Sequence, residues 1–429
     1  MDSISRISET SFRLGEEFRQ PLRVEPVKFI FKCFEERGYT IRIVGGAVRD
    51  ILMRRLPKDV DFATSARPHE IKTVCYCNHI RCVETGLQHG TMTLVINGSN
   101  YEVTTLRIDK ETDGRHAVVE YTEDWQRDAE RRDLTVNAMS ISSDGILYDY
   151  FNGLQDLLHY RVKFVRDPAQ RIKEDYLRIL RYFRFYPKIA HSEASDESFD
   201  PVVLGIIKEL APNLSRISVE RVWMELSQIL TGKFAPSVVK VMNSLEIFKY
   251  CGFNDLDLSF DLYEKYYHAA THRENCRDVP KVRSCSLLAA FFSNAEESEK
   301  LCRKIKLSND ERSTCLFIIE NRSNHKIVQG TPESLKHYKA VLVYNYSSGR
   351  QEYFLRCVVQ LMLIEGATNE QILEIIEWKA PLFPVSGADL VPLCERKRIG
   401  FILERLKLKW IESEFTANRE QLLQFYCNN

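Results

Sequence analysis

The sequence predicts an α+β protein in which a mixed α/β part comes first and an all-helical part follows. From Ile41 to Val165, short runs rich in β-branched and aromatic residues alternate with helical stretches, which is typical of a mixed sheet. After Asp167 and Pro168 the pattern becomes long, helical and rich in Leu, Arg, Lys and aromatic residues. We therefore expect about 260 residues to form helices only.

The expected elements of the mixed part follow one another in order. Each strand is a short β-rich run, and each helix is a longer stretch that carries apolar residues at helical spacing. The predicted strands are 41–45, 59–64, 91–96, 101–108 and 161–165, and the predicted helices are 47–55 and 68–77. We find no fixed-period repeat and no low-complexity segment.

Composition excludes several classes of protein. The 429 residues are 44% hydrophobic, but the longest apolar runs, 285–292 and 357–364, are too short to span a membrane. The 12 cysteines include no C-x-x-C pair, which favours a reducing compartment. Acidic residues are interspersed with the arginines of the first 25 residues, whereas transit peptides are acid-poor. We expect an intracellular protein without a clear transit peptide, in the mitochondrion, the cytoplasm or the nucleus.

An acidic pair, Asp59 and Asp61, gives the strongest chemical signal. On a strand, residues two apart point to the same face, with Cα atoms roughly 6.6 Å apart. Two carboxylates so placed suit Mg²⁺, which prefers hard oxygen ligands and is usually held by carboxylates together with substrate phosphates. Such a pair is also common in turns, so the surrounding motifs decide whether it is read as a metal site.

A glycine pair, Gly45 and Gly46, separates the predicted strand 41–45 from the predicted helix 47–55. Glycines at a helix N-terminus let backbone N–H groups approach phosphate oxygens. The spacing matches neither a dinucleotide-binding fingerprint nor a P-loop. Arg49 follows one turn later and is expected to reach the same phosphates; a tight turn with a surface arginine is the alternative.

Glu102, in the predicted strand 101–108, is the expected third acid. Three carboxylates beside a triphosphate suit a two-metal displacement, in which one ion activates a hydroxyl and the other stabilises the leaving pyrophosphate. We expect Asp59 and Asp61 to bind both ions, and Glu102 to bridge to the ion nearer the hydroxyl. A surface glutamate is the alternative.

Basic residues gather in one stretch although the formal net charge of the chain is zero. Residues 161–190 contain nine Lys or Arg against three Asp or Glu, a local charge of about +6. Such a cluster is typical of a surface that binds phosphates.

Together these segments resemble the class II tRNA nucleotidyltransferases, the CCA-adding enzymes of the poly(A) polymerase superfamily. Over residues 41–186 the resemblance is carried, in order, by GGAVRD, DVDFAT, TTLRID with TDGRHA, DAERRDLTVNAMS, DYFNGLQDL and EDYLRILRYFRF. Further along, RVWMELSQIL and PLFPVSGADL resemble the helical body and tail of that family.

The resemblance implies four domains and an activity. The domains are a nucleotidyltransferase head (1–165), a helical neck with a base-selecting helix (166–225), a helical body (226–340) and a tRNA-binding tail (341–429). The implied enzyme needs Mg²⁺ and adds C, C and A to the 3′ end of tRNA from CTP and ATP without a nucleic-acid template. No membrane and no obligatory protein partner is implied.

Several residues take their roles from the resemblance. It implies that Arg132 binds the triphosphate and that Asp133 and Asn137 contact the sugar. It also implies that Asp175 and Arg178, at i and i+3 of one helix, form an amino-acid template for the incoming base.

The chemistry of such a template is consistent with its residues. Cytosine and adenine both present an amino group beside a ring nitrogen, so Asp175 can accept while Arg178 donates. Uracil and guanine present the opposite pattern, and an unpaired buried polar group costs about 1–3 kcal/mol. The template admits C and A but does not tell them apart. Arg181 is assigned to phosphate or base support, as is Arg184, which is rotated further from Asp175.

Three other features of the sequence bear on its function. Residues 109–124 are polar and turn-prone, and the resemblance implies a loop there that serves addition of the final A, which argues against an enzyme that adds only CC. The basic and apolar segment 395–413 is expected to contact the RNA backbone at the tRNA elbow rather than a membrane. His268 and His272 have a zinc-like spacing but lack a third ligand, so no zinc site is predicted.

Two alternative functions stay open. A poly(A) polymerase of the same superfamily would use Asp175 and Arg178 for ATP as well, so only nucleotide preference separates the two enzymes. A non-catalytic RNA-binding relative is the other alternative, and the presence of Asp59, Asp61 and Glu102 argues against it.

Overall fold

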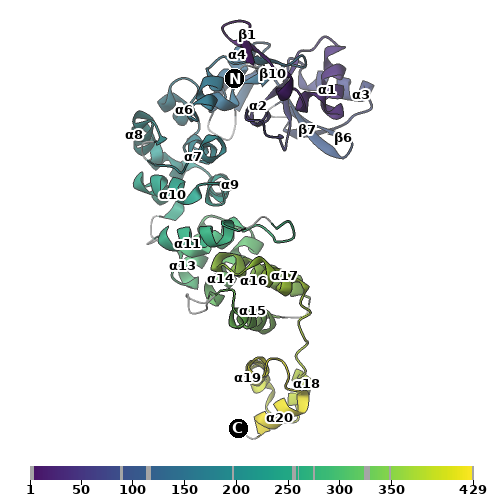
Figure 1. Ribbon diagram of the computed structural model, residues 1–429, viewed down its shortest axis with the longest axis vertical. Coiled ribbons are helices and arrows are strands. Elements are labelled where there is room, and N and C mark those ends of the chain that lie inside the picture. Colours follow the sequence, from purple (N-terminus) through teal and green to yellow (C-terminus); the bar gives the residue numbers. More distant parts are fainter. Residues whose placement is uncertain are drawn as a thin grey trace. The chain divides into compact units, whose positions relative to one another are not determined.

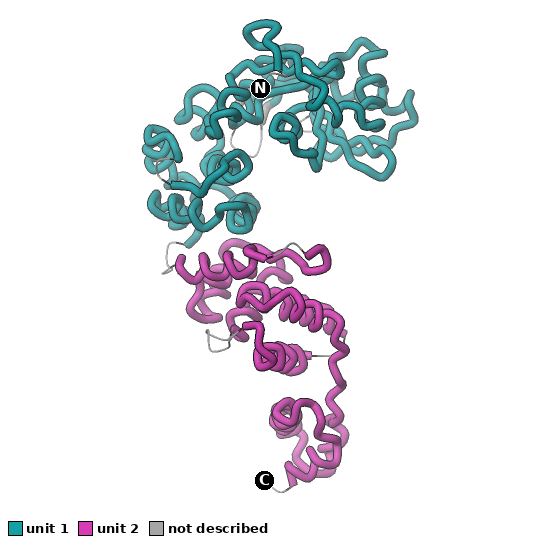
Figure 2. The backbone as a smooth tube through the Cα atoms, in the orientation of Figure 1, with its two compact units in different colours: residues 1–254 teal, residues 255–429 magenta. Residues whose placement is uncertain are grey.

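The protein divides into two compact units, residues 1–254 and 255–429 (Figure 2). The computed structural model describes residues 4–86, 90–112, 117–195, 198–253, 258, 260–273, 276–322, 329–346 and 349–427. The finer domain boundaries at 165, 225 and 340 stay predictions. Among the described residues, no helix has the length and apolar character that crossing a membrane requires.

A mixed sheet occupies the N-terminal part of the first unit (Figure 1). In the described part of the chain it has nine strands, in the order β1-β2-β11-β10-β3-β4-β7-β6-β5. The strands are β1 (Ile4–Arg6), β2 (Ser11–Leu14), β3 (Ile41–Val44), β4 (Asp61–Thr64), β5 (Arg81–Gly86), β6 (Thr91–Ile96), β7 (Ser99–Thr105), β10 (Ser140–Ile141) and β11 (Ile146–Tyr148). Helices follow, so the predicted α+β class is confirmed.

The pairing of β4 with β7 is parallel, and it brings two of the predicted acids together. Phe62 lies opposite Val103, and both are fully buried. Asp61 and Glu102 are the residues that precede this pair on the two strands. Because strand side chains alternate, the two acids point to the face opposite the buried pair.

In the described part of the chain, five α-helices accompany the sheet: α1 (Glu25–Glu35), α2 (Gly46–Leu52), α3 (Pro68–Cys77), α4 (Trp125–Glu130) and α5 (Gly153–Leu158). On α1, Val27, Ile30, Phe31 and Phe34 repeat at three- and four-residue spacing, and all four are buried. The ring of Phe31 meets the ring of Phe62 edge-on at 5.5 Å. The apolar stripe of α1 therefore packs on the sheet.

Some predicted elements differ in the structure. The predicted strand 161–165 is wrong, because Phe164 makes only an isolated bridge with Leu134. The predicted strand 59–64 begins at Asp61, so Asp59 lies in a bend before it. The turn-prone segment 109–124 contributes instead to a two-stranded sheet of β8 (Arg107–Thr112) and β9 (Ala117–Tyr121), while residues 113–116 lie outside the described part.

The rest of the first unit is helical. Its helices are α6 (Pro168–Glu174), α7 (Arg178–Ile189), α8 (Pro201–Leu210), α9 (Val219–Leu230) and α10 (Ala235–Ser244). EDYLRILRYFRF was expected to be one helix, but the chain is extended at Asp175, with φ −154° and ψ 106°. The carboxylate of Asp175 accepts the N–H of Leu177 at 3.1 Å, so it starts a new turn that leads into α7.

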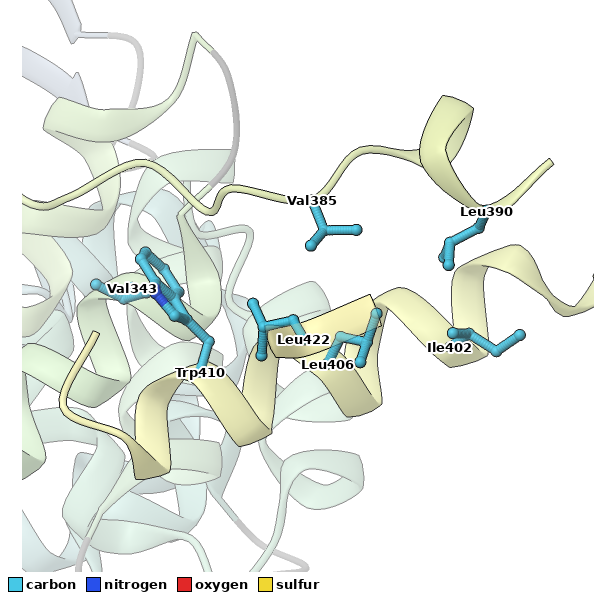
Figure 3. Close-up of a cluster of buried hydrophobic side chains, with 7 residues drawn as sticks. All are labelled: Val343, Val385, Leu390, Ile402, Leu406, Trp410 and Leu422. Carbon is cyan, nitrogen blue, oxygen red and sulfur yellow. The ribbon is translucent and has the colours of Figure 1, made fainter. Parts of the chain in front are cut away.

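The second unit is helical throughout its described residues. Its helices are α11 (Phe260–Thr271), α12 (Ser284–Leu288), α13 (Ala295–Lys304), α14 (Asn309–Asn321), α15 (Pro332–Asn345), α16 (Gln351–Glu365), α17 (Asn369–Glu377), α18 (Gly387–Leu390), α19 (Ile399–Glu412) and α20 (Arg419–Cys427). A small core near the C-terminus joins Ile402, Leu406 and Trp410 of α19 to Leu422 of α20 (Figure 3). Val343 of α15 belongs to the same core, which ties the last helices to the rest of the unit.

Candidate active site

A cavity of about 390 Å³ opens among elements of the first unit. It brings together the β3–α2 turn, the end of α4, the α6–α7 break and α9, which lie far apart in the sequence. Its lining residues are Gly45, Gly46, Asp109, Arg131, Arg132, Asp133, Asn137, Asp175, Leu177, Arg178, Arg181, Phe185 and Arg221. Five arginines face three aspartates there, so the wall is cationic and suits a polyanion.

Gly45 and Gly46 form the turn that begins α2. Gly45 has a φ of +70°, which favours glycine, and a Cβ atom there would lie 3.4 Å from Nη1 of Arg132. Both glycines line the cavity. The turn therefore leaves backbone N–H groups at a helix N-terminus open to the cavity, beside an arginine.

Arg49 is buried, with 4% of its surface exposed, and does not line the cavity. It donates to Asp50 Oδ1 from Nε at 3.1 Å and from Nη2 at 2.9 Å. Its Nη1 donates to Asn137 Oδ1 at 3.0 Å. In this structure Arg49 positions Asn137, and its predicted contact with phosphate stays a prediction.

Arg131 and Arg132 share one buried carboxylate, that of Asp128. Arg131 donates to its Oδ1 at 2.8 Å and Arg132 to its Oδ2 at 3.2 Å. Burial raises the pKa of Asp128, but the two arginines outweigh burial, so the net pKa is lowered. Asp128 therefore stays ionised and holds both guanidinium groups at the cavity wall.

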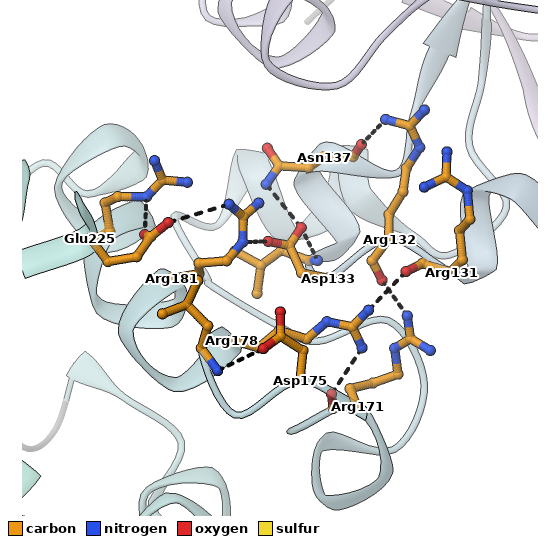
Figure 4. A network of polar contacts seen from close by, with 12 residues as sticks. Arg131, Arg132, Asp133, Asn137, Arg171, Asp175, Arg178, Arg181 and Glu225 are labelled. Carbon is orange, nitrogen blue, oxygen red and sulfur yellow. Dashed lines mark hydrogen bonds and ion pairs between the residues drawn. The ribbon is translucent and has the colours of Figure 1, made fainter. Parts of the chain in front are cut away.

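Asp133 and Asn137 link the head to α7 (Figure 4). Asp133 accepts from Arg181 Nε at 2.6 Å, from the N–H of Leu134 at 2.8 Å and from Asn137 Nδ2 at 3.4 Å. Burial raises its pKa, yet the charge of Arg181 outweighs burial and the net pKa falls. Both residues line the cavity, and their predicted sugar contacts stay predictions.

Asp175 and Arg178 both reach the cavity although they do not share one helix. Asp175 Oδ2 accepts from Arg221 Nη2 at 2.7 Å, and its Oδ1 accepts the N–H of Leu177. Each oxygen has a second lone pair, so each can still accept one more hydrogen bond. The carboxylate is thus held in place without being saturated.

Arg178 is held in the same manner (Figure 4). Its Nη1 donates to Glu174 Oε2 at 2.6 Å and to the carbonyl oxygen of Arg171 at 2.9 Å, and its Nη2 donates to the carbonyl oxygen of Arg131 at 3.1 Å. A guanidinium has five N–H groups. Within the described residues, the Nε–H and one Nη2–H remain for a ligand.

Arg181 and Arg184 differ in exposure to the cavity. Arg181 lines it and pairs with Asp133, while Arg184 is not among the lining residues. Arg184 pairs with Glu225 at 2.8 Å and donates to Gln228 Oε1 at 2.9 Å, both on α9. We call Asp128, Asp133, Asp175 and Glu225 with their arginines the arginine network.

Asp59, Asp61 and Glu102 lie outside the cavity lining and form what we call the carboxylate edge. Burial, followed by the charges of Glu102 and Asp59, raises the pKa of Asp61 to about 6, against an opposing effect of Arg132. These couplings place the other two acids and Arg132 near Asp61. In the described part of the chain, none of the three has an ion-pair partner.

The carboxylate edge fits a divalent cation chemically. Three like charges with no counter-charge of their own favour a bound cation, and carboxylate oxygens are the donors Mg²⁺ prefers. Within the described residues no three acidic, His or Cys side chains are already gathered at ligand distance. Asp59 and Glu102 are exposed, so rotation of their side chains toward Asp61 does not disturb the core.

The sequence alone does not single out every cavity residue. Arg221 belongs to RVWMELSQIL, which contributes only to the family resemblance, and Asp109 begins the predicted loop 109–124. Phe185 belongs to the predicted base-selecting helix but was not singled out. Arg131 precedes the predicted Arg132 in the sequence, but its position in the cavity wall becomes clear only from the contact that both arginines make with Asp128.

Two family models match the first unit. The model described as "Poly A polymerase head domain" matches residues 41–163. The model described as "Probable RNA and SrmB- binding site of polymerase A" matches residues 198–251.

Curated relatives match almost the whole chain. A protein of Homo sapiens named "CCA tRNA nucleotidyltransferase 1, mitochondrial" is 37% identical over 409 residues, which cover 95% of this chain and 91% of that protein. The protein of the same name from Danio rerio is 39% identical over 398 residues, with 91% and 88% covered. Similarity of this extent over both proteins indicates common membership of a family.

A solved structure has the same fold. The CCA-adding enzyme of Bacillus stearothermophilus, in complex with CTP, aligns with 97% of this chain and 99% of its own, at a TM-score of 0.70 and 24% identity. This similarity supports the order of a mixed-sheet head followed by helices.

Proposed function

Because this chain belongs to the CCA tRNA nucleotidyltransferases of the poly(A) polymerase superfamily, we propose that it adds C, C and A to the 3′ end of tRNA. It takes these nucleotides from CTP and ATP, releases pyrophosphate and needs no nucleic-acid template. The observation that carries the proposal is the single cavity where the glycine turn, Arg132 and the Asp175–Arg178 pair meet.

The phosphate end of the nucleotide lies at the glycine turn in this proposal. Backbone N–H groups of Gly45 and Gly46 and the guanidinium of Arg132 bind the triphosphate there. Asp128 supports this role, since its hydrogen bond with Nη2 holds Arg132 in place but does not occupy all N–H groups of the guanidinium. Asp133 and Asn137 contact the sugar.

The base end of the nucleotide lies at Asp175 and Arg178. Asp175 accepts from the exocyclic amine of cytosine or adenine, and the remaining N–H groups of Arg178 donate to the adjacent ring nitrogen. Their partners Arg221 and Glu174 hold both side chains in place before the base arrives. A fixed template of this kind rejects uracil and guanine because their pattern of donors and acceptors is reversed.

The carboxylate edge holds Mg²⁺ in this proposal, through Asp59, Asp61 and Glu102. Bound magnesium supplies Lewis-acid stabilisation for the attacking hydroxyl and the leaving pyrophosphate. Arg132 connects the edge with the cavity electrostatically, since it lines the cavity and lowers the pKa of Asp61. The chain thereby keeps the acids close to the phosphates that they serve.

Two further segments contribute in this proposal. Residues 109–124 serve addition of the final A, so shortening them leaves CC addition intact and impairs A addition; equal loss of all three steps would reject this role. The basic helix α19 and the residues before it contact the tRNA elbow. Since the human and zebrafish relatives are named as mitochondrial, the protein acts at least in mitochondria, which subcellular fractionation checks.

The test is an extension assay resolved to single nucleotides. Purified protein is incubated with Mg²⁺, tRNA that lacks its 3′ CCA, and CTP, ATP, UTP or GTP, singly and together. Two additions with CTP and a third only when ATP is present are expected. A long ladder with ATP alone would indicate a poly(A) polymerase, and absence of extension would indicate a non-catalytic RNA-binding protein.

A further inference from the structure

Four cations surround one buried aromatic ring at the edge of the cavity. The ring is that of Phe185, which is 6% exposed and lines the cavity. Its centroid lies 5.4 Å from the guanidinium carbons of Arg49 and Arg181, 4.5 Å from that of Arg184 and 4.9 Å from Nζ of Lys188. The ring stabilises cations, but it carries no negative charge to neutralise them.

Three of the four cations have a carboxylate partner. Arg49 pairs with Asp50 at 2.9 Å and Arg181 with Asp133 at 2.6 Å. Arg184 pairs with Glu225 at 2.8 Å.

Lys188 is the fourth cation, and it has no ion-pair partner among the described residues. Its backbone carbonyl accepts from Arg55 Nη1 at 2.9 Å, which fixes the position of its main chain. The ammonium of Lys188 is therefore the surplus positive charge of the cluster.

The surroundings of Lys188 oppose its charge. The side chain is partly buried, and burial, followed by the charges of Arg184 and Arg49, lowers its pKa to about 8. An ordinary surface lysine extends its ammonium into water, away from other cations. Because burial and the neighbouring cations destabilise the Lys188 ammonium, an anion that binds beside it stabilises the charged form.

We propose that Lys188 binds a phosphate group of the substrate, and this inference rests on the proposed function. Lys188 lies ten residues after Arg178, about 15 Å along the axis of α7. It is therefore distant from the base-reading pair, and the charges of Arg184 and Arg49 act on it. The phosphate belongs either to the backbone of the tRNA 3′ end or to the nucleotide triphosphate, and the two sources are distinguished below.

The first experiment compares Lys188→Met, Lys188→Arg and the control Lys28→Met. Methionine keeps most of the apolar stem and removes the charge, and Lys28 is an exposed lysine of α1 in the same unit. The measurements are the Kd for tRNA lacking CCA, over a series of salt concentrations, and the KM for CTP.

If the phosphate is that of the RNA backbone, Lys188→Met weakens tRNA binding about 5- to 20-fold and reduces the slope of log Kd against log salt by about 1. If it is that of the triphosphate, the KM for CTP rises by a similar factor while the tRNA slope is unchanged. Lys188→Arg keeps most of the affinity in either case, and Lys28→Met behaves as wild type.

Two results would overturn the inference. One is wild-type affinity and salt slope for tRNA, with a wild-type KM for CTP, in a folded Lys188→Met protein. The other is equal loss in Lys188→Met and Lys188→Arg, because a purely structural role would produce it. If wild-type protein adds CCA while either result is found, the inference fails and the proposed function stands.

A pH series on the wild type gives an independent test that needs no folded variant. The charged groups that face Lys188 are Arg49 and Asp50 of α2, Arg181 and Arg184 of α7, and Glu225 of α9. In the free protein the Lys188 ammonium loses its proton as the pH rises through about 8. Affinity for the phosphate-bearing substrate is then expected to fall between pH 7.5 and 9, and a constant affinity would contradict the proposal.

Discussion

In the proposed function Asp61 and Asp133 serve the same active site, yet their pKa values are shifted in opposite directions. Burial raises the pKa of both carboxyls. The negative charges of Glu102 and Asp59 add to this effect at Asp61, whereas the positive charge of Arg181 opposes it at Asp133. The carboxylate edge is left with uncompensated negative charge, while the arginine network pairs each of its acids. The comparison indicates that the edge favours binding of a cation, and that the acids of the network are already paired in the free protein.

This difference also separates the two tasks of the proposed reaction. In our proposal the carboxylate edge supplies reactivity for every nucleotide, because its acids hold the metal and are not assigned to the base. The arginine network supplies selectivity in the proposal, because Asp175 and Arg178 are held in place with only a few hydrogen-bonding positions open. Changes at the edge are therefore expected to lower all rates together, and changes in the network to alter the ratio between nucleotides.

The largest expected effect follows from Asp61→Asn. Loss of this ligand removes several kcal/mol of stabilisation from the transition state, so addition of C and of A is expected to fall about 10³-fold or more. Rates of single additions with CTP and with ATP measure this. Because the folded-state pKa of Asp61 is raised, its ionisation costs stability progressively as the pH rises from about 4 to about 6 and in full above that, so at pH 7.5 the metal-free variant is expected to melt no lower than wild type. A lower melting temperature would mean that the activity was lost through misfolding.

The next effect concerns selectivity. Asp175→Ala removes the acceptor for the exocyclic amine, which is worth about 1–3 kcal/mol, so the preference for CTP over UTP is expected to fall about 5- to 150-fold. The ratio of kcat/KM values for CTP and UTP measures it. Glu209→Gln, an exposed acid on α8, is the matched control. A uniform loss of rate with an unchanged ratio would contradict the assignment of Asp175 to base reading.

A smaller effect is the competition between protons and Mg²⁺ at the carboxylate edge. Because the pKa of Asp61 is raised to about 6, protons compete with the cation below that pH and hardly at all above it. The Mg²⁺ concentration for half-maximal rate is expected to rise up to about tenfold per pH unit below 6 and to stay constant between pH 7 and 8. Titrations from pH 5 to 8 measure it, and a value independent of pH would place Asp61 away from the metal.

The smallest effect is expected at Arg221, which supports Asp175 without being assigned a base contact. Arg221→Met breaks a partly exposed ion pair, worth about 1 kcal/mol or less. Selectivity for CTP over UTP is expected to fall less than fivefold, because Asp175 keeps its bond from Leu177. An effect as large as that of Asp175→Ala would show that Arg221 itself reads the base.

Much of the candidate site can be predicted from the sequence, because several of its residues lie close together along the chain. The glycine turn, the Asp59–Asp61 pair and the Asp175–Arg178 spacing all appear within short segments. The position of Glu102 relative to Asp61 is not local, because it is set by the parallel pairing of β4 with β7. The sequence therefore offers Glu102 as a candidate third acid but does not show that it lies near Asp61. That pairing joins residues about 40 positions apart, which a local pattern does not encode.

The remainder depends on tertiary contacts. EDYLRILRYFRF contains no Gly or Pro, so helical spacing predicted one helix, but the side chain of Asp175 competes for the backbone and starts a new turn. Its pairing with Arg221 spans 46 residues. The predicted strand 161–165 failed because its β-rich residues find only one bridging partner, at Leu134.

The most direct test compares wild type, Asp61→Asn and Asp175→Ala in single-turnover addition to tRNA lacking CCA, with CTP and with UTP. The account predicts that Asp61→Asn lowers both rates by the same large factor and keeps the ratio of CTP to UTP. It predicts that Asp175→Ala lowers that ratio and retains measurable chemistry. If Asp61→Asn changed the ratio while Asp175→Ala left it intact, the division between a reactive carboxylate edge and a selective arginine network would be wrong.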